Sequence, residues 1–436
     1  MSQYLLIKDG EVVFPDKIIK SDILIKEKKI KKISPKIEVK NCFKVIDAKG
    51  RYVLPGAIDV HTHMELESTS GMISSDDYLT GSRAGLKCGV TTFFGFAYQR
   101  PNESLIDAYK RTYESASKKS VSNFYLHAGI LNTDMNYEKQ IKECVKIGIR
   151  SFKLHLNDPK VDNDFLTNIF QIASFYDVIL LLHCEDGKIV KFNTNKLIKN
   201  KKVSLKYFPL SRKNFVEKIA IDTVITLAKE FKTKIYIVHL TTKEGLESIK
   251  RAKEEGSSQI ECETCPQYLL LTDKIYKLKE GYLYTCTPPF RSKNDNNALW
   301  QGLKEGIIKI ISTDHCPFKK SQKYIGKKDF TKLPFGIPGI ETLYHLILSE
   351  GIKRGFQIYE LVNFVSTNPA KFFKIYPERG IIRENSYADL VIYNPDVIWR
   401  IDSKELITNC DFTPYENFKI KGKIEKVIFE GEIVNL

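Results

Sequence analysis

The sequence predicts an α/β fold: a (β/α)8 TIM-type barrel with a small β-sandwich-like domain formed by the N- and C-terminal segments. Eight short apolar runs recur between residues 56 and 316 at intervals of roughly thirty residues, the length of one strand–helix–strand unit. Stretches with helical periodicity separate these runs, and such an alternation is typical of a closed parallel barrel. Both ends of the chain instead carry short apolar segments broken by Asp-Gly and Lys-Gly turns.

The predicted barrel strands follow one another along the middle of the chain. In order they are GAIDVHTH (56–63), VTTFFGF (90–96), NFYLHAGI (123–130), RSFKLHL (150–156), VILLLHC (178–184), KIYIVHL (234–240), SQIECET (258–264) and GIIKIISTD (306–314). The stretches between them are rich in good helix formers, and they predict helices over residues 104–119, 138–148, 216–231 and 242–256.

The domain division follows from these elements. We expect the barrel to span residues 56–380. Residues 1–55 and 381–436 each hold too few strands for a stable sheet, so we expect the two segments to pair into one small β-domain.

Composition restricts the function classes. With 436 residues, 42% of them hydrophobic, the chain can form a globular protein of one large and one smaller domain. The formal net charge is +15, but the lysines alternate with acidic residues, as in IKRAKEEG at 249–256. This pattern is typical of a solvated surface, so we expect no nucleic-acid partner.

The cysteines and apolar runs indicate a cytoplasmic protein. Nine cysteines are an odd number, and the chain begins MSQYLLIKDGEVV without a basic-then-apolar leader, which favours free thiols in a reducing compartment. Runs such as VILLL at 178–182 are too short to span a bilayer, so we expect no membrane role. One CETC at 262–265 imitates a metal or redox pair, but no second such pair accompanies it, and we interpret it as structural.

Residues with metal-binding chemistry stand at the ends of five predicted strands. Residues i and i+2 of a strand share one face, so two histidines separated by one residue can hold one ion. The active site of a barrel of this kind lies at the carboxyl ends of its strands. Imidazoles and carboxylates suit two divalent ions, of which zinc fits best. The six candidate ligands are His61, His63, Lys153, His183, His239 and Asp314.

Lys153 has two interpretations, because an ammonium group repels a cation. Its amine could react with carbon dioxide to form a carbamate, which would bridge two metals as a carboxylate does. Alternatively, Lys153 is an ordinary charged lysine paired with Asp314 or Asp186. Spacing alone leaves both interpretations open.

Together, these motifs resemble the dihydropyrimidinase and D-hydantoinase family of cyclic amidohydrolases, over nearly the whole chain. The matching stretches are PGAIDVHTHMEL (55–66), SFKL (151–154), HCED (183–186), PLSR (209–212) with Glu217 soon after, VHLTT (238–242), ETCPQYLLLT (263–272), TPPFR (287–291), TDHCPF (313–318), DFTKLP (329–334) and ADLVIYNP (388–395).

The resemblance implies a metal-dependent hydrolase that opens a hydantoin or 5,6-dihydropyrimidine ring to an N-carbamoyl amino acid. It implies N6-carboxylysine at Lys153 and general-base catalysis by Asp314. It also implies a homotetramer, and it places Thr287 where relatives often have a serine that contacts the ring. The implied metal ligands are His61, His63 and Asp314 for one ion, His183 and His239 for the other, with Lys153 between them.

Three positions depart from the family pattern. Asp158 stands where relatives usually have a tyrosine that helps to hold the attacked oxygen, and we expect His155, two residues beyond Lys153, either to replace it or to cap the barrel layer. Phe335 stands where relatives commonly have asparagine in a substrate loop. Glu65 occupies the place of the arginine by which dihydroorotases bind the substrate carboxylate, which argues against dihydroorotate.

Two rival functions follow from the same resemblance. An allantoinase-like hydrolase would use the same metal ligands on another ureide. A non-catalytic assembly protein, as some relatives have become, would typically have lost metal ligands, and all six are retained here.

Overall fold

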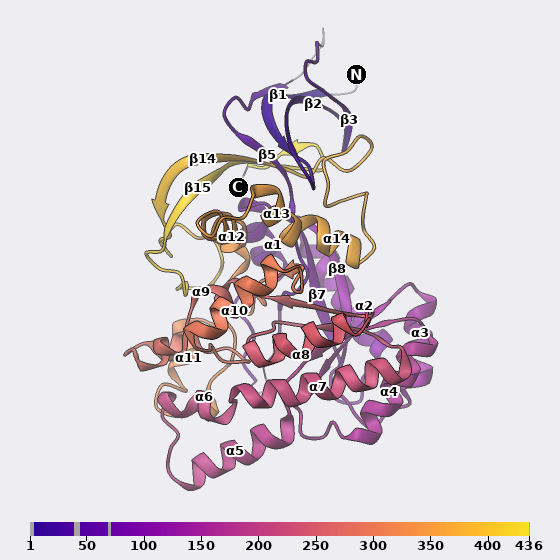
Figure 1. Ribbon diagram of the computed structural model, residues 1–436, viewed down its shortest axis with the longest axis vertical. Coiled ribbons are helices and arrows are strands. Elements are labelled where there is room, and N and C mark those ends of the chain that lie inside the picture. The colour runs from indigo at the N-terminus through magenta and orange to yellow at the C-terminus, as the bar shows by residue number, and fades with distance from the viewer. Residues whose placement is uncertain (1–3, 39–43, 69–70, 436) are drawn as a thin grey trace.

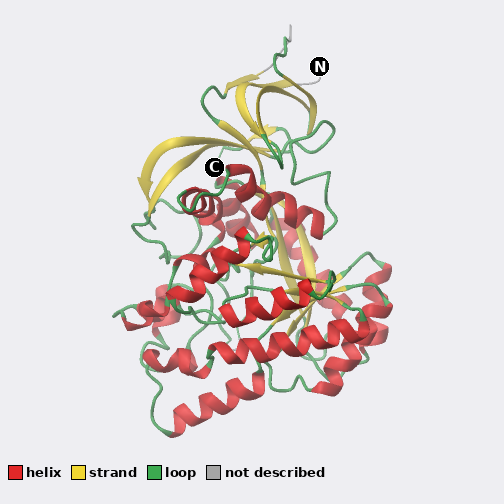
Figure 2. Cartoon of the chain, in the orientation of Figure 1, coloured by secondary structure: helices red, strands yellow, loops and turns green. Residues whose placement is uncertain are grey.

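The computed structural model describes residues 4–38, 44–68 and 71–435 of the chain. The predicted fold class is confirmed: eight parallel strands form a barrel, and strands from both ends of the chain form a separate mixed sheet (Figures 1 and 2). In Figure 1 the terminal sheet lies at the top, beside both chain ends, and the barrel with its helices lies below it.

The barrel strands pair in sequence order, each parallel to the next. They are β6 (Ala57–Asp59), β7 (Val90–Tyr98), β8 (Asn123–Ile130), β9 (Ser151–His155), β10 (Ile179–His183), β11 (Lys234–Ile237), β12 (Ile260–Thr264) and β13 (Ile310–Ile311). Near the ends of the first and last strands, Asp59 Oδ1 accepts the Thr313 N–H at 3.0 Å. A parallel bridge between Thr62 and His315 continues this contact.

Helices cover the outside of the barrel, and others lie in its connecting segments and beside the terminal sheet. They are α1 (Tyr78–Lys87), α2 (Leu105–Lys119), α3 (Tyr137–Lys146), α4 (Asn163–Phe175), α5 (Gly187–Lys199), α6 (Phe208–Ser211), α7 (Asn214–Phe231), α8 (Lys243–Glu254), α9 (Pro266–Leu270), α10 (Lys293–Lys304), α11 (Lys320–Tyr324), α12 (Leu343–Ile352), α13 (Ile358–Val362) and α14 (Asn368–Phe372). Helices α2, α3, α7 and α8 occupy the four predicted stretches. Side-chain caps fix several starts, for example at Ser104, which accepts the Asp107 N–H.

Aromatic and branched side chains fill the barrel interior. Phe94 and Phe96 of β7, Leu181 of β10 and Tyr236 of β11 belong to one buried cluster inside the barrel. A much larger apolar cluster lies between the strands and the surrounding helices. The interior is therefore a packed core rather than an open channel.

The terminal sheet joins the two ends of the chain, as the sequence predicts. Its strands are β1 (Tyr4–Val13), β2 (Ile18–Lys26), β3 (Lys29–Ser34), β4 (Lys44–Asp47), β5 (Tyr52–Pro55), β14 (Leu390–Arg400), β15 (Lys419–Phe429) and β16 (Glu432–Ile433). Antiparallel pairing of β14 with β5 links the segments, with Leu390 opposite Pro55. Eight cysteines are free thiols, and the ninth, Cys42, lies outside the described residues.

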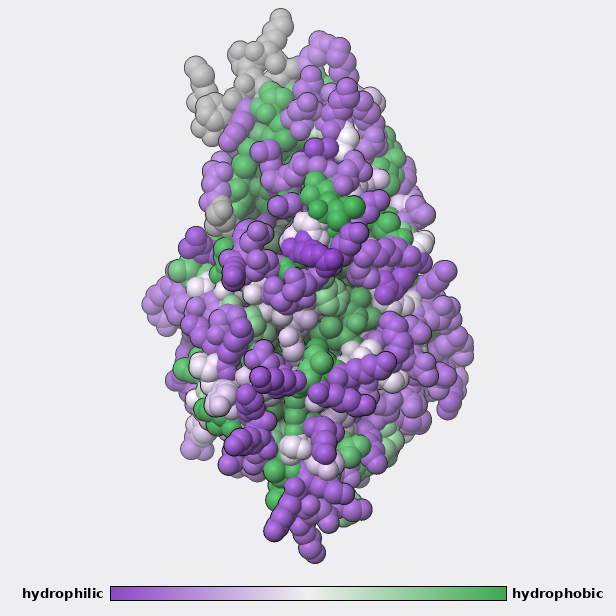
Figure 3. Space-filling view, turned by 90° about the vertical axis from the view of Figure 1, so that its left-hand side faces the viewer, coloured by the Kyte–Doolittle hydropathy of each residue, from purple (hydrophilic) through white to green (hydrophobic). Residues whose placement is uncertain are grey.

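The surface agrees with the mixed charge pattern of the sequence. Hydrophilic residues cover most of the face in Figure 3, with smaller hydrophobic areas between them. Many lysines pair with acidic neighbours, such as Lys118 with Glu114 at 2.6 Å and Lys250 with Glu305 at 2.8 Å. Within the described residues, no helix combines the length and the hydropathy that a membrane span requires.

Candidate metal centre and active site

The segment that follows β6 carries the first two candidate ligands. β6 ends at Asp59, so His61 and His63 lie beyond the strand on which the sequence predicted them. Thr62 fixes the backbone between them, because its N–H and its hydroxyl both donate to Phe94 O, at 3.0 and 2.9 Å. The His63 N–H donates to His315 O at 2.7 Å. These contacts keep the segment extended, and both imidazoles face the barrel mouth.

Two other ligands also follow strands that end earlier than predicted. β11 ends at Ile237 and β13 at Ile311, before His239 and Asp314 respectively. Both later residues have a positive φ, 39° for His239 and 52° for Asp314, which few non-glycine residues adopt. Such a backbone ends the extended run and turns the side chain toward the mouth. Strained backbone of this kind is found disproportionately at functional sites.

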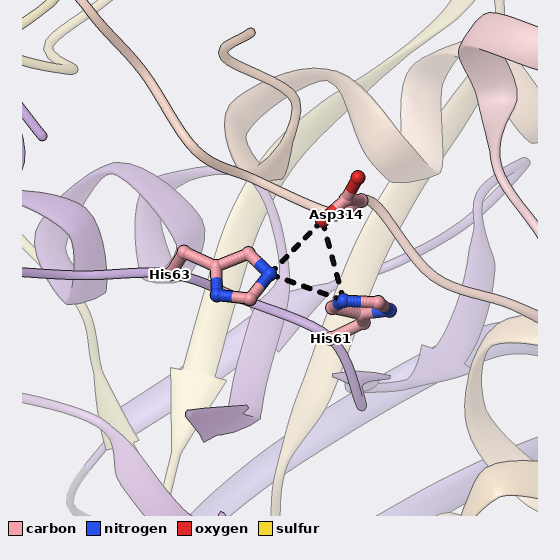
Figure 4. Close-up of side chains that lie close together, drawn as sticks. All are labelled: His61, His63 and Asp314. Atoms are coloured by element: carbon pink, nitrogen blue, oxygen red, sulfur yellow. Dashed lines mark hydrogen bonds and ion pairs between the residues drawn. The ribbon is translucent and has the colours of Figure 1, made fainter. Parts of the chain in front are cut away.

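Three of these side chains converge on one point (Figure 4). His61 Nε2 and His63 Nε2 are 3.1 Å apart, and each lies within 3.2 Å of Asp314 Oδ1. A tetrahedral ion with ligands at about 2.1 Å keeps neighbouring donor atoms about 3.4 Å apart. The spacing of the three atoms therefore fits one shared cation.

The hydrogen bonds of His61 support the same conclusion. Glu263 Oε1 lies 2.5 Å from His61 Nδ1, and this carboxylate also accepts from the Tyr236 hydroxyl and the His239 N–H. His61 therefore donates through Nδ1 and presents the lone pair of Nε2 to Asp314. Burial keeps the imidazole neutral by lowering its pKa well below the usual value, and the charge of Lys153 lowers it further. Two lone-pair atoms that face each other at 3.2 Å are stable only with a cation or proton between them.

A second group of imidazoles lies beside the first. His183 is the last residue of β10, and its ring centroid is 4.6 Å from that of His239. The His239 ring is in turn 5.4 Å from the ring of His61. His183 Nε2 is bonded to Glu185 at 2.8 Å, which leaves Nδ1 as its ligand atom. An acidic partner on the outer nitrogen is typical of metal-binding histidines.

Lys153 lies in the barrel interior under these groups. Its side chain is fully buried, and Nζ has no hydrogen-bond partner among the described residues. Asp186, the alternative partner from the sequence, instead caps α5 by accepting the Ile189 N–H at 2.9 Å. Burial lowers the pKa of Lys153, and the charges of Asp314 and Glu263 partly oppose this effect. The pairing with Asp186 is therefore wrong.

Several polar atoms at the mouth share the unsatisfied state of Lys153. His63 Nδ1, His239 Nδ1 and Glu185 Oε1 are buried without a hydrogen-bond partner in the described part of the chain. A buried polar atom left unpaired costs about 1–3 kcal/mol. A bound ligand or ion can satisfy such groups, so the residues present fit a metal centre.

Sequence reasoning missed the acidic residues that hold the ligands. Glu263 is the glutamate inside CETC; it is fully buried, and its contact with His61 Nδ1 shows that it faces the barrel interior. Asp59 is buried below His61 and accepts its N–H at 3.3 Å; burial raises the pKa of Asp59 to about 6. Glu185 stands two residues after His183, which it contacts, and it also pairs with Arg212. An acidic residue at an inward-facing position in or just after a predicted strand was the sequence signal that could have revealed them.

The predicted substrate residues lie at the end of β9 and in loop segments. His155 is the last residue of β9, half-buried, with its ring centroid 5.6 Å from that of His183. Thr287 is half-buried and precedes a cis proline. Phe335 stacks on Phe208 of α6 with centroids 5.1 Å apart. Asp158 lies in the turn after β9, where its Oδ1 accepts the Lys160 N–H at 2.9 Å.

Glu65 occupies a position unsuited to binding a substrate carboxylate. It accepts the Ser115 hydroxyl at 2.7 Å and pairs with Lys119, both on α2. Its negative charge is thereby directed toward the helix.

Comparison with known proteins agrees with this geometry. Residues 52–434 match the family model described as "Amidohydrolase family". A D-hydantoinase from Ralstonia pickettii is 32% identical over 437 residues, which are 99% of this chain and 94% of the relative. The crystal structure of a dihydropyrimidinase from Brevibacillus agri superposes with a TM-score of 0.95 at 30% identity, covering 100% of this chain and 95% of that one. A D-hydantoinase (dihydropyrimidinase) from Thermus sp. gives 0.94 at 32% identity, covering 98% and 94%. On this evidence, the chain belongs to the amidohydrolase family.

Proposed function

We propose that the protein is a binuclear metal-dependent cyclic amidohydrolase that opens a hydantoin or 5,6-dihydropyrimidine ring to an N-carbamoyl amino acid. The observation that carries this proposal is the convergence of His61, His63 and Asp314 beside His183 and His239 at the mouth of the barrel. Full-length similarity to D-hydantoinases and a dihydropyrimidinase supports the choice of ring.

The proposed metal ligands divide into two sets. His61, His63 and Asp314 would hold one ion, and His183 with His239 would hold the other. A charged ammonium on Lys153 would have no acceptor among the described residues, whereas a carbamate would serve as an anionic ligand to both ions. The carbamate forms when the amine nitrogen bonds to the carbon of carbon dioxide and loses one proton. Zinc suits this set of imidazoles and carboxylates.

When bound, the two ions would supply an acidified water and a polarised ring carbonyl. Asp314 then has two tasks in the proposed reaction. Its carboxylate accepts the proton that the water loses as its oxygen bonds to the carbonyl carbon. The protonated carboxyl then returns that proton to the ring nitrogen as the carbon–nitrogen bond breaks, so one water is consumed and one N-carbamoyl amino acid forms.

His155 and Thr287 are the proposed substrate-binding residues. Both are half-buried, in contrast with the fully buried Lys153, so a bound ring can reach them. The turn contact of Asp158 supports a change in this part of the site relative to the family, because an ionised carboxylate offers no hydrogen to an oxyanion.

The proposal is tested by a hydrolysis panel with metal-loaded protein. The substrates are hydantoin, 5-substituted hydantoins, dihydrouracil, allantoin and dihydroorotate, and the product is the free N-carbamoyl acid measured by chromatography. We expect turnover of hydantoins or dihydrouracil and none of dihydroorotate. Preference for allantoin would favour the allantoinase-like function, and a metal-loaded protein that opens none of these rings would favour a non-catalytic role.

We also propose that the enzyme is a cytoplasmic homotetramer. The eight free cysteines support a reducing compartment, and the tetramer rests on the resemblance to the family. Light scattering coupled to size-exclusion chromatography should give four times the mass of one chain, 50.2 kDa; a monomer mass would contradict it.

A further inference from the structure

Tyr98 is a tyrosine at the barrel mouth with no role in the function proposed above. It is the last residue of β7 and faces the interior, packing against the cluster that contains Phe94 and Phe96. Its ring lies parallel to that of His63, with centroids 6.0 Å apart and planes at 13°. Tyr98 is therefore placed at the edge of the proposed metal centre.

A glycine on the neighbouring strand allows this placement. Tyr98 pairs with Gly129 of β8, and Gly129 pairs with Lys153 of β9. A Cβ atom added to Gly129 would lie 2.2 Å from Tyr98 Cδ1, which is closer than any real contact. The Tyr98 ring crosses β8 over this glycine and reaches β9.

On β9 the Tyr98 hydroxyl meets His155. Tyr98 Oη and His155 Nε2 are 3.0 Å apart, and the ring centroids are separated by 5.5 Å. Both side chains are half-buried, so they line the accessible part of the site. Burial raises the pKa of Tyr98 well above its ordinary value, which keeps the phenol protonated and able to donate.

The same part of the site lacks the donor that the family pattern leads one to expect. Asp158 stands five residues after Lys153, and its carboxylate accepts a backbone N–H of its own turn. Tyr98 places a hydroxyl group, which can donate a hydrogen bond, beside His155 at the end of β9.

We propose that Tyr98 replaces the missing tyrosine and donates a hydrogen bond to the carbonyl oxygen as that oxygen gains charge, an inference that rests on the proposed function. His155 remains in the proposed substrate site, but toward the reacting oxygen it is then a positioning residue that acts through Tyr98. A neutral imidazole that donates through Nε2 to Tyr98 Oη fixes the ring and leaves the phenolic hydrogen for the substrate. Tyr98 is the catalytic residue, because it alone of the pair touches the reacting oxygen.

The first test is Tyr98→Phe, which removes the hydroxyl and keeps the ring. We expect kcat on the best substrate of the panel to fall by about 10²-fold, the usual effect of losing one preorganised donor, with metal content unchanged. The matched control is Tyr125→Phe: Tyr125 pairs with Phe94 on the adjacent strands, away from the mouth, and stacks on it with centroids 4.8 Å apart. This control should retain wild-type kcat.

A double-mutant cycle separates the two roles. If His155 acts through Tyr98, His155→Ala should lower kcat more than it changes KM, and His155→Gln, which keeps an N–H donor, should recover part of the loss. The double variant Tyr98→Phe/His155→Ala should then be no slower than Tyr98→Phe alone. Losses that multiply, or a larger loss in His155→Ala than in Tyr98→Phe, would make His155 the direct donor and overturn the proposal.

Gly129→Ala tests the placement without removing either functional group. The new methyl group should displace the Tyr98 ring and lower kcat to a similar extent. If this variant folds poorly, as judged by circular dichroism and metal content, the double-mutant cycle still decides the question.

Equilibrium binding provides a measurement independent of turnover. The probe is N-carbamoylglycine, the product of hydantoin opening, titrated calorimetrically into metal-loaded wild-type and Tyr98→Phe protein. We expect about tenfold weaker binding in the variant, because one hydrogen bond to the new carboxylate is lost. A wild-type protein that opens no ring would refute the proposed function itself. An active wild type with Tyr98→Phe within threefold of it in kcat and affinity would refute only the role of Tyr98.

Discussion

Two fully buried lysines show how the barrel mouth differs from the loops around it. Lys153 on β9 and Lys323 on α11 both have 0% exposure, and burial lowers the pKa of both. Lys323 donates to Thr285 O at 2.9 Å, to Thr285 Oγ1 at 3.2 Å and to Pro334 O at 3.1 Å. Lys153 Nζ has no such acceptor among the described residues. A buried ammonium group with three acceptors stabilises the fold through its hydrogen bonds. A buried lysine nitrogen with no acceptor indicates a different chemical state.

The surroundings of the two lysines extend this difference. The segments that Lys323 joins carry Thr287 and Phe335, and the Gly336 N–H donates to Thr285 O at 2.9 Å, so the substrate loops are tied by ordinary hydrogen bonds. At the mouth, His63 Nδ1 and His239 Nδ1 are buried and unpaired in the described part of the chain, like Lys153. Lys323 thus has the acceptors that a buried ammonium requires, whereas Lys153 lies among other unpaired polar atoms at the centre.

The largest effect should come from replacing the lysine without acceptors. Lys153→Ala removes the proposed bridging ligand, and several kcal/mol of transition-state stabilisation should be lost with it, lowering kcat by about 10³-fold. Metal content should fall below two ions per chain. Short carboxylic acids with bicarbonate are expected to restore part of both, because they can supply a bridging carboxylate. Unchanged metal content and rate would favour an ordinary charged lysine.

Lys323→Met is the matched variant of the second buried lysine, the one that has acceptors. The thioether cannot donate, so the carbonyl groups of Thr285 and Pro334 lose a donor, and we expect a loss of about 2–4 kcal/mol in the free energy of unfolding. The variant should still bind two ions per chain. Urea denaturation with metal analysis checks both expectations. A loss of metal at unchanged stability would show that the two lysines do not differ as described.

A smaller effect should follow from removing the support of His61. Glu263→Gln replaces the carboxyl group beside Nδ1 with an amide, and loss of such a partner typically weakens metal affinity by about 10–100-fold. Competition against a fluorescent chelator measures this. The control is Glu261→Gln on the same strand, which pairs with Lys253 at 2.6 Å, and it should leave the affinity unchanged. Equal metal affinities for the two variants would show that Glu263 does not support the metal ligand His61.

The regular parts of the fold could be predicted from the sequence because local patterns determine them. The strand over residues 123–130 has the predicted bounds, and the helix predicted over 104–119 is found at Leu105–Lys119. The candidate ligands were also recognisable, because their residue types stand directly after apolar runs. The ends of β6, β11 and β13 were not, because tertiary contacts such as Thr62 with Phe94 determine where pairing stops.

The supporting contacts of the site could not be predicted because they join distant parts of the chain. Glu263 and His61 are 202 residues apart, and Tyr98 and His155 are 57 apart. Neither pair leaves a local pattern. The role of Gly129 depends on the register of three strands, which periodicity does not determine.

The measurement that tests the central claim most directly is the metal content of the wild-type protein. Purified protein is saturated with zinc and carbon dioxide, freed of loosely bound ions by gel filtration, and analysed by plasma mass spectrometry against the protein concentration. The unpaired donors at the mouth predict close to two zinc ions per chain, and chelation should remove the ions and the ring-opening activity together. A protein that retains no zinc under these conditions would contradict the account.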